Sequence, residues 1–252
     1  MNDELPPSPA PAPKLAPKPV RGASKNQLLA LAVVGILIAV TGFMLVKKVP
    51  EAPDALPVTA DGSEPTLPIP SSTEIAKNYG GLTTNTAQQS LVTRVGNQVA
   101  SKSDAAKAGV SFRFLVLADK NKINVFATPD GTVFITSLLL NRLKTEGQLA
   151  GMLAHEIAQI TNKNRPKYLA TGVIVYTPEQ EDKADRDGVK FMSQAGYDPT
   201  AFVTTLMMIR DVNAEYAVEF FQSHPSPVNR VAHIDYAIRQ IYPEGVPESL
   251  SD

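Results

Sequence analysis

The residues with the clearest chemical potential are His155, Glu156 and Gln159, in the sequence HEIAQ. A helix with the pattern H-E-x-x-H places two imidazoles one turn apart on one face. There they bind zinc, while the glutamate activates a metal-bound water. Gln159 stands at the position of the second imidazole, and its neutral amide is a poor ligand for zinc. Three interpretations are open: a zinc enzyme, an enzyme with a rebuilt metal site, or a protein that retains the fold without the chemistry.

Any histidine-based site in this chain must draw on three residues, His155, His224 and His233. Cysteine is absent, which excludes disulfides, thiolate zinc sites and a cysteine nucleophile. His224 lies in the segment HPSPVNR together with Arg230, at the start of the last expected helix. His233 falls inside that amphipathic helix, so we expect it to be a packing or surface residue.

Two acidic residues, Glu181 and Asp185, are spaced by four positions in the segment TPEQEDKADRDG. On a helix they share a face, and two like charges at this spacing weaken a plain solvated helix. The pair becomes useful if Glu181 binds a cation and Asp185 accepts a hydrogen bond from a metal-bound histidine. A solvated acidic face, balanced by Lys183 and Arg186, is the alternative interpretation.

The coarse pattern of elements indicates an α+β fold, because strands in one block precede a run of helices. Thr177 with Pro178 and Gln180 forms a capping box at the start of one of those helices. The expected strands are residues 111–119, 122–129 and 132–137, and the expected helices are residues 86–101, 138–144, 146–163, 178–194, 199–212 and 227–241.

An uncharged run of nineteen residues, 28–46, is long enough to cross a bilayer as a helix. A cleaved signal peptide is the alternative, but its apolar core is normally shorter and a small-x-small cleavage site should follow. The domains that we expect are a proline-rich disordered cytoplasmic arm (1–26), a transmembrane anchor (27–48), a proline-rich linker (49–71), a peptidase-like domain (72–246) and a tail (247–252).

The positive charges around the apolar run predict its orientation in the membrane. Four of them precede it, whereas Lys47 and Lys48 follow it and are succeeded by acidic residues. We therefore expect a single-pass protein of the bacterial inner membrane, with the main domain in the periplasm. A net charge of −1, with no glycine-rich phosphate loop and no basic aromatic patch, argues against a nucleic-acid or nucleotide partner.

Four segments occur in an order typical of one family: INVFATPDGTVFITSLLL, QLAGMLAHEIAQ, EDKADRDGVKFMSQAGYDP and HPSPVNR. Over about residues 85–240 the chain resembles the membrane-associated zinc peptidases of the HtpX and BepA type, a group that includes the CAAX prenyl endopeptidase. The resemblance implies a zincin-like (gluzincin) domain in which a small, mainly antiparallel sheet lies beside a helical bundle.

The resemblance also implies roles for individual residues. His155 would be the first zinc ligand, Glu156 the general base, Glu181 the third ligand, and Asp185 the aspartate behind a ligand histidine. His224 and Arg230 would belong to the late active-site loop. The strand 132–137, with Phe134 and Thr136, would be the edge strand that pairs with an extended peptide substrate.

Several positions depart from the family pattern. Gln159 replaces the second histidine ligand, and Asn164 stands where many relatives have another histidine. The turn between two expected strands is Pro-Asp-Gly rather than Pro-Gly-Gly. Residues 165–176 form a shorter connection between the two metal helices than relatives generally have, so one wall of the cleft should be smaller or absent.

Two functions remain open on this basis. The first is a zinc-dependent metalloendopeptidase with a metal site rebuilt from His155, Glu181 and His224, although a ligand from that late loop would also obstruct substrate. The second is a pseudopeptidase of the cell envelope, which binds a protein or peptide as an assembly, quality-control or scaffold factor. We favour the second, because losing one of three protein ligands lowers zinc affinity by orders of magnitude.

Overall fold

The computed structural model describes residues 70–252 except 165, 169–173 and 225–229. The predicted arm, transmembrane anchor and nearly all of the linker therefore lie outside the described residues. The chain divides into two compact units, Met1–Leu56 and Pro57–Asp252, and every element described below belongs to the second. Within the described part of the chain, no helix combines the length and the apolar character needed to cross a membrane.

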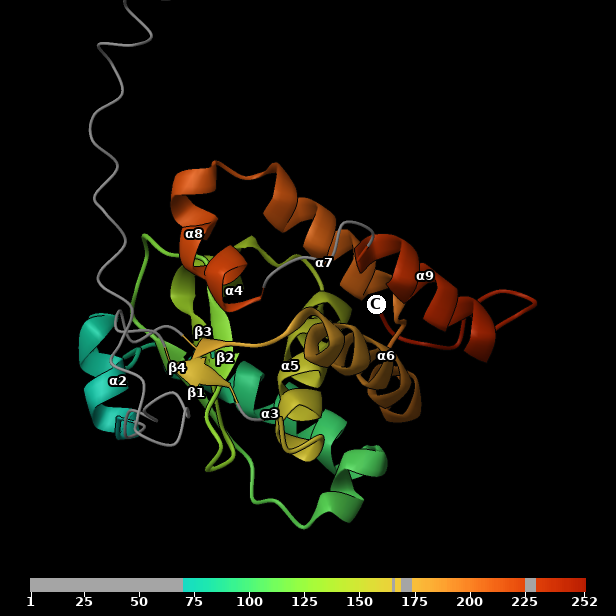
Figure 1. Cartoon of the computed structure of the whole chain (residues 1–252), viewed down its shortest axis with the longest axis horizontal. Coiled ribbons are helices and arrows are strands. Elements are labelled where there is room, and N and C mark those ends of the chain that lie inside the picture. The colour runs from blue at the N-terminus through green and yellow to red at the C-terminus, as the bar shows by residue number, and fades with distance from the viewer. Residues whose placement is uncertain (1–69, 165, 169–173, 225–229) are drawn as a thin grey trace, which may run out of the picture. The chain divides into compact units, whose positions relative to one another are not determined.

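The described elements confirm a mixed α and β domain (Figure 1). Most of the expected helices are present within a few residues of their predicted bounds. In chain order the elements are α2 (Ser72–Asn78), α3 (Thr86–Lys102), the 3-10 helix η1 (Asp104–Ala108), β1 (Arg113–Leu117), β2 (Val125–Ala127), β3 (Thr132–Thr136), α4 (Ser137–Arg142), α5 (Glu146–Thr161), β4 (Lys167–Tyr168), β5 (Ile174–Val175), α6 (Pro178–Ala195), α7 (Thr200–Asp211), α8 (Ala214–Ser223) and α9 (Arg230–Ile241).

The three-stranded sheet has the order β1-β3-β2, which corrects two expectations. β3 pairs in parallel with β1 over five residues and antiparallel with β2 over three, so the longest pairing is parallel. β3 is also the central strand, and the prediction that residues 132–137 form an edge strand is wrong. The cause is that the hairpin turn at Gly131 sets β3 antiparallel beside β2, while the other edge of β3 pairs with β1.

Phe134 and Thr136 are both fully buried in this central strand and serve the fold. The Phe134 ring stacks on Phe126 of β2, with ring centroids 5.1 Å apart. The Thr136 side chain accepts from the backbone N–H of Leu139 and so caps α4. Neighbours occupy both hydrogen-bonding edges of β3, so neither residue can receive a substrate strand there.

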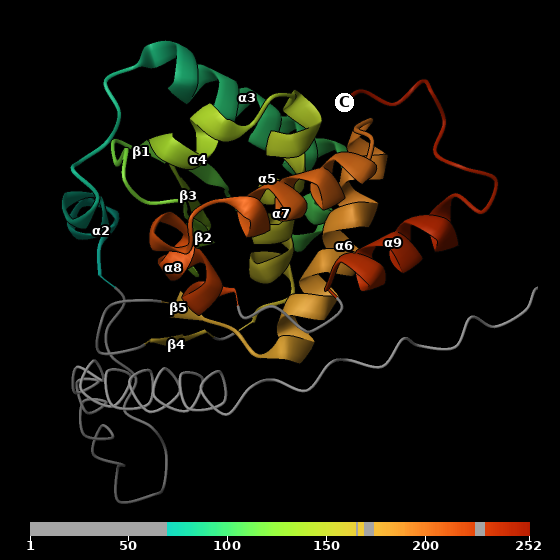
Figure 2. The ribbon, with the colours of Figure 1, turned by 90° about the horizontal axis from the view of Figure 1, so that it is seen from above.

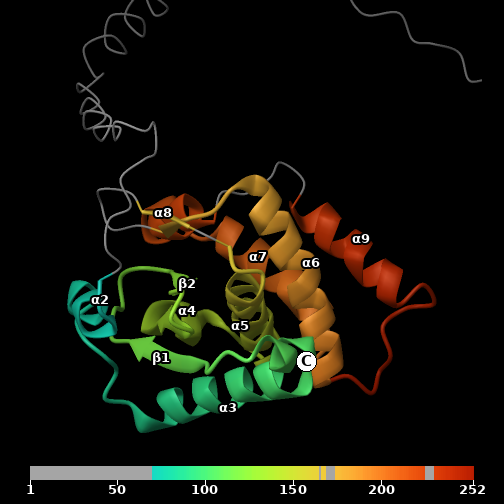
Figure 3. The ribbon, with the colours of Figure 1, turned by 60° about the horizontal axis from the view of Figure 1, so that its bottom comes forward.

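Helix α5 lies at the centre of the domain, and almost all of its residues are buried. Figures 2 and 3 show α3, α6 and α7 around it, with α9 packed on the outer side of α6. The capping box of Thr177 and Gln180 at the start of α6 is present as predicted. Gly188 of α6 faces His155 of α5 so closely that a Cβ at position 188 would lie 3.2 Å from the His155 backbone nitrogen. This close approach brings the functional positions of the two helices together.

Two hydrophobic cores flank the sheet. The larger is shared by one sheet face and helices α3, α5, α6, α7 and α9. The smaller lies on the other face, where α2 and β5 cover the Phe126 and Phe134 rings. Helices α2 and α8 and the β4–β5 pair were not predicted from the sequence. The predicted tail also returns to the domain, because Ser251 forms a β-bridge with Tyr197.

Candidate metal-type site

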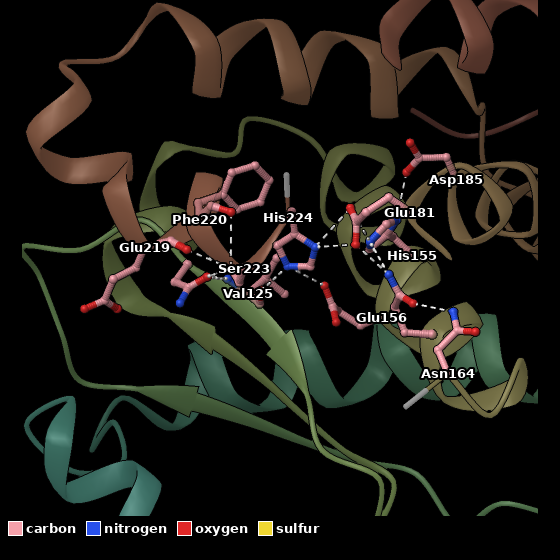
Figure 4. Close-up of polar contacts among 12 residues, drawn as sticks. Val125, His155, Glu156, Asn164, Glu181, Asp185, Glu219, Phe220, Ser223 and His224 are labelled. Carbon is pink, nitrogen blue, oxygen red and sulfur yellow. Dashed lines mark hydrogen bonds and ion pairs between the residues drawn. The ribbon is translucent and has the colours of Figure 1, made fainter. Parts of the chain in front are cut away.

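The predicted site residues converge from four elements, as Figure 4 shows for most of them. His155, Glu156 and Gln159 come from α5, and Glu181 and Asp185 come from the first turns of α6. His224 directly follows α8, and Arg230 opens α9. All seven side chains are buried, with exposed fractions of 5% or less. The structure therefore brings together these seven predicted residues, whereas Phe134 and Thr136 lie in the central strand.

His155 is held by an aspartate that is itself held by an arginine. The Nδ1 atom of His155 lies 2.8 Å from Asp185 Oδ1. Arg230 donates to both oxygens of Asp185, from Nε at 2.6 Å and from Nη2 at 2.7 Å. These hydrogen bonds orient His155 so that Nε2 faces the interior of the site, which is the arrangement that metal-binding histidines use.

Glu181 is the anionic centre of the site. Its Oε1 accepts from Gln159 Nε2 at 2.7 Å, and its two oxygens lie 3.2 and 3.3 Å from His224 Nδ1. His155 Nε2 and Arg230 Nη1 approach its Oε2 at 3.6 and 3.4 Å. Burial on its own would raise the pKa of Glu181, but His224 and His155 outweigh it and hold that pKa well below the usual value. Glu181 is therefore ionised at neutral pH.

The Gln159 amide turns its nitrogen, not its oxygen, toward the site. Nε2 donates to Glu181 and lies 3.3 Å from His155 Nε2. The oxygen at the other end accepts from Asn164 Nδ2 at 2.6 Å. The opposite orientation would set the amide oxygen against a carboxylate oxygen at hydrogen-bond distance, which is repulsive. Gln159 thus presents a hydrogen-bond donor where a second ligand would be needed.

Glu156 is buried, and the contacts of its carboxylate compensate only in part. Neither carboxylate oxygen has a hydrogen-bond partner among the described residues, although His224 Nε2 is 3.3 Å from Oε1. Burial raises the pKa of Glu156, and the attraction of His224 reduces this effect only in part. A buried carboxylate in this state costs free energy, and such groups are found where function retains them.

His224 closes the site on the side of the sheet. Its Nε2 lies 2.9 Å from the backbone oxygen of Val125 in β2. In β2, the backbone groups of Asn124 and Thr128 pair with β3, so by alternation those of Val125 and Ala127 point to the free edge. β2 is thus the edge of the ladder that has no neighbouring strand, although its residues are buried, and His224 contacts its Val125 carbonyl. This contact was not predicted from the sequence, because the edge strand was expected at β3.

The charge state of His155 follows from its neighbours. Burial on its own would lower the pKa of the imidazole, but the carboxylates of Glu181 and Asp185 outweigh it and raise the pKa to about 10. The pKa of Asp185 is lowered in turn, because Arg230 and His155 overcome the effect of its burial. Without a metal, this part of the site is a buried array of alternating charges.

The donor atoms fit a metal ion in part. One ligand atom each from His155, Glu156 and His224 lies within 4.8 Å of the others, and Glu181 is close to both histidines. Gln159 does not fit, because its N–H groups point into the same region and would repel a cation. His233 lies on the surface, as one of the two expectations for it had it, and pairs there with Asp182.

The sequence is similar to those of known peptidases. The chain is 25% identical over 200 residues to the beta-barrel assembly-enhancing protease of Escherichia coli (strain K12), a match that covers 63% of this chain and 40% of that protein. It is 21% identical over 160 residues to the mitochondrial metalloendopeptidase OMA1 of Arabidopsis thaliana, with 52% and 33% covered. The chain therefore spans less than half the length of these relatives.

A family model described as Peptidase family M48 matches residues 86–175 and 165–238. The two matches meet in the connection between α5 and α6, where the sequence predicted a shortened segment. They include every residue of the buried site and together cover more than half of the chain. The chain therefore belongs to peptidase family M48.

Proposed function

We propose that this chain is a pseudopeptidase: a peptidase-family domain that binds a protein or peptide of the cell envelope and does not cleave it. The direction of the Gln159 amide carries the proposal. In this role the domain is held at the bacterial inner membrane by residues 27–48 and acts on the periplasmic side as an assembly, quality-control or scaffold factor. Nucleic acid is not among its partners.

Two features of the site disfavour metal binding: it has too few protein ligands, and the Gln159 N–H donor points at the ligands that remain. A catalytic zinc keeps three protein ligands and one open position. His155 and Glu181 supply two, and Gln159 directs its N–H donor at both of them. That donor already stabilises the Glu181 carboxylate, so the site is satisfied at this point without a cation. A metal would have to displace this hydrogen bond and also the proton of His155.

The edge of β2 is the surface that supports binding of an extended peptide. A peptide strand added there would use the outward backbone groups of Val125 and Ala127. Of these, the Val125 N–H now donates to Asn124 Oδ1 at 3.0 Å. His224 now occupies the Val125 oxygen, so peptide binding requires this histidine to move. We therefore expect the change His224→Ala to strengthen peptide binding.

Two measurements on the purified full-length chain test the proposal. Zinc content after dialysis against zinc should be far below one ion per chain, and an unfolded protein substrate should stay intact. In cells, the variant Glu156→Gln should restore the function of a deletion strain as well as the wild type does. Stoichiometric zinc together with loss of function in Glu156→Gln would contradict the proposal.

A second candidate is a metallopeptidase with a rebuilt site, and the cluster of His155, Glu156 and His224 favours it. In that case the two histidines and Glu181 would hold the ion, which supplies Lewis acidity and an activated water. Glu156, which lacks hydrogen-bond partners among the described residues, would take the proton of that water. The two candidates predict opposite effects of His224→Ala. In a metallopeptidase this change would abolish zinc binding and cleavage, whereas in a pseudopeptidase it strengthens peptide binding.

A further inference from the structure

The end of α5 places Asn164 directly over Gln159. The backbone N–H of Lys163 donates to the Ile160 carbonyl at 2.9 Å, and that of Asn164 donates to the Gln159 carbonyl at 3.2 Å. Lys163 has a positive φ of 53°. These features define a Schellman cap, in which the second residue after the cap folds back on the third residue from the helix end. Here those two residues are Asn164 and Gln159.

This cap differs from the usual one in the contact between its two side chains. An apolar contact commonly joins these positions. In this chain two amides meet instead, and Asn164 Nδ2 donates to Gln159 Oε1 at 2.6 Å. Gln159 Nε2 then donates to Glu181 at 2.7 Å. The three side chains form one hydrogen-bonded row that runs from the end of α5 into the site.

We propose that Glu181 and Asn164 together fix the polarity of the Gln159 amide, and that the group at position 164 thereby decides whether the site admits a metal cation. The inference rests on the proposed function, since it names what keeps the metal out. For Gln159 to offer its oxygen as a ligand, its nitrogen would have to face residue 164. Asn164 would then have to turn as well, because two amide nitrogens cannot share a hydrogen bond. The amides are coupled, and the carboxylate of Glu181 favours the orientation in which Gln159 donates.

The side chain of residue 164 can be changed without removing the helix cap. Both cap bonds are made by backbone atoms, so they persist when the side chain is replaced. The change Asn164→Asp keeps the size of the side chain and leaves an acceptor only. The introduced carboxylate would accept from the Gln159 nitrogen and turn the amide oxygen toward His155 and Glu181. There the oxygen would face both His155 Nε2 and the Glu181 carboxylate. The carboxylate repels it, and a cation bound between the two oxygens would remove that repulsion.

The test compares zinc binding by the full-length chain with two variants, Asn164→Asp and Asn162→Asp. The second adds the same charge at the same helix end but has no contact with Gln159, because Asn162 bonds to Asp187 and Lys183. Zinc affinity is measured by competition with a chelating dye, and zinc-dependent stabilisation by thermal unfolding. We expect Asn164→Asp to bind zinc at least about tenfold more tightly than Asn162→Asp and to gain melting temperature with zinc.

Each outcome has a separate meaning. A zinc affinity of Asn164→Asp no greater than that of Asn162→Asp, with a wild type that binds no zinc, overturns the inference and leaves the proposed function intact. A wild type that binds one zinc ion per chain overturns the proposed function itself. If Asn164→Asp does not fold, Asn164→Glu provides an acceptor of the same charge, with Asn162→Glu as its control. Gln159→His, which restores an imidazole ligand, gives the upper limit of affinity for this site.

Discussion

The carboxylate of Glu156 is buried at the centre of the site with neither oxygen hydrogen-bonded among the described residues. A buried polar group without partners costs about 1–3 kcal/mol, and more when it is charged. Because an amide is neutral, we expect the isosteric change Glu156→Gln to stabilise the metal-free protein by about 1 kcal/mol at pH 7. Thermal unfolding in the presence of a chelator measures this difference. A fall in melting temperature would mean that the carboxylate stabilises the fold.

The stability difference between Glu156→Gln and the wild type should depend on pH. The pKa of Glu156 is raised in the folded protein, mainly by burial, so the folded state binds its proton more tightly than the unfolded state does. Its contribution to stability is therefore fully present below the unfolded pKa of about 4.5 and is lost as pH rises through the folded pKa. The advantage of Glu156→Gln over the wild type should shrink as pH falls from 7 toward 4.5. An advantage that grows on acidification would contradict the assignment.

Arg230 provides a second prediction for a single residue. It is the buried cation that neutralises Asp185, and through Asp185 it orients His155. Removing one partner of a buried ion pair leaves an uncompensated charge, so Arg230→Leu should lower the free energy of unfolding by about 3–5 kcal/mol. Arg94→Leu is the matched control, because the Arg94–Glu146 pair is exposed and should contribute less than about 1 kcal/mol. Urea unfolding of both variants checks the difference.

At the scale of elements, the C-terminal cap of α5 carries a local strain. Lys163 adopts a left-handed conformation, which a side chain with a Cβ disfavours by roughly 1 kcal/mol. Glycine is the usual residue at this position of a Schellman cap. We expect Lys163→Gly to raise the free energy of unfolding by about 0.5–1 kcal/mol, and Lys163→Ala, which keeps the Cβ, to change it by only a few tenths. Equal effects of the two substitutions would show that the backbone is not strained there.

The elements also show why sequence patterns succeeded in some places and failed in others. The start of α6 was predicted because its capping box lies within four consecutive residues. The order of the strands was not, since β3 enters the centre of the sheet through pairing with β1, which is distant in sequence. α8 was missed although its signal is present: Asn213 caps it, and Ala217 and Phe220 form its buried face. The sequence predicted a poor zinc ligand at Gln159 but not which end of its amide faces the site. That end depends on two neighbours, Glu181 and Asn164, which the sequence pattern does not place against it.

At the scale of the whole domain, the first described helix, α2, is connected to the site through residues of α8. Tyr79, which directly follows α2, donates its hydroxyl to Glu219 of α8 at 2.9 Å. Lys122 pairs with the same carboxylate and lies over the Tyr79 ring. Asn124 contacts both Tyr79 and Ser223, the last residue of α8. The helix that follows the predicted linker is thus joined to the segment that carries His224.

This connection predicts that α2 steadies the position of His224. The pKa of Tyr79 is raised, mainly by burial and then by Glu219, so its hydroxyl remains a donor. Tyr79→Phe removes only this hydroxyl, and a bond to a charged group contributes about 1.5–3 kcal/mol. Amide hydrogen exchange in α8 should therefore become at least about tenfold faster, while exchange in α3, which makes no bond to Tyr79, stays unchanged. If α8 exchanges at the wild-type rate, the network does not hold the helix. If both helices accelerate equally, the substitution acts on global stability and leaves His224 without a link to the N-terminal segment.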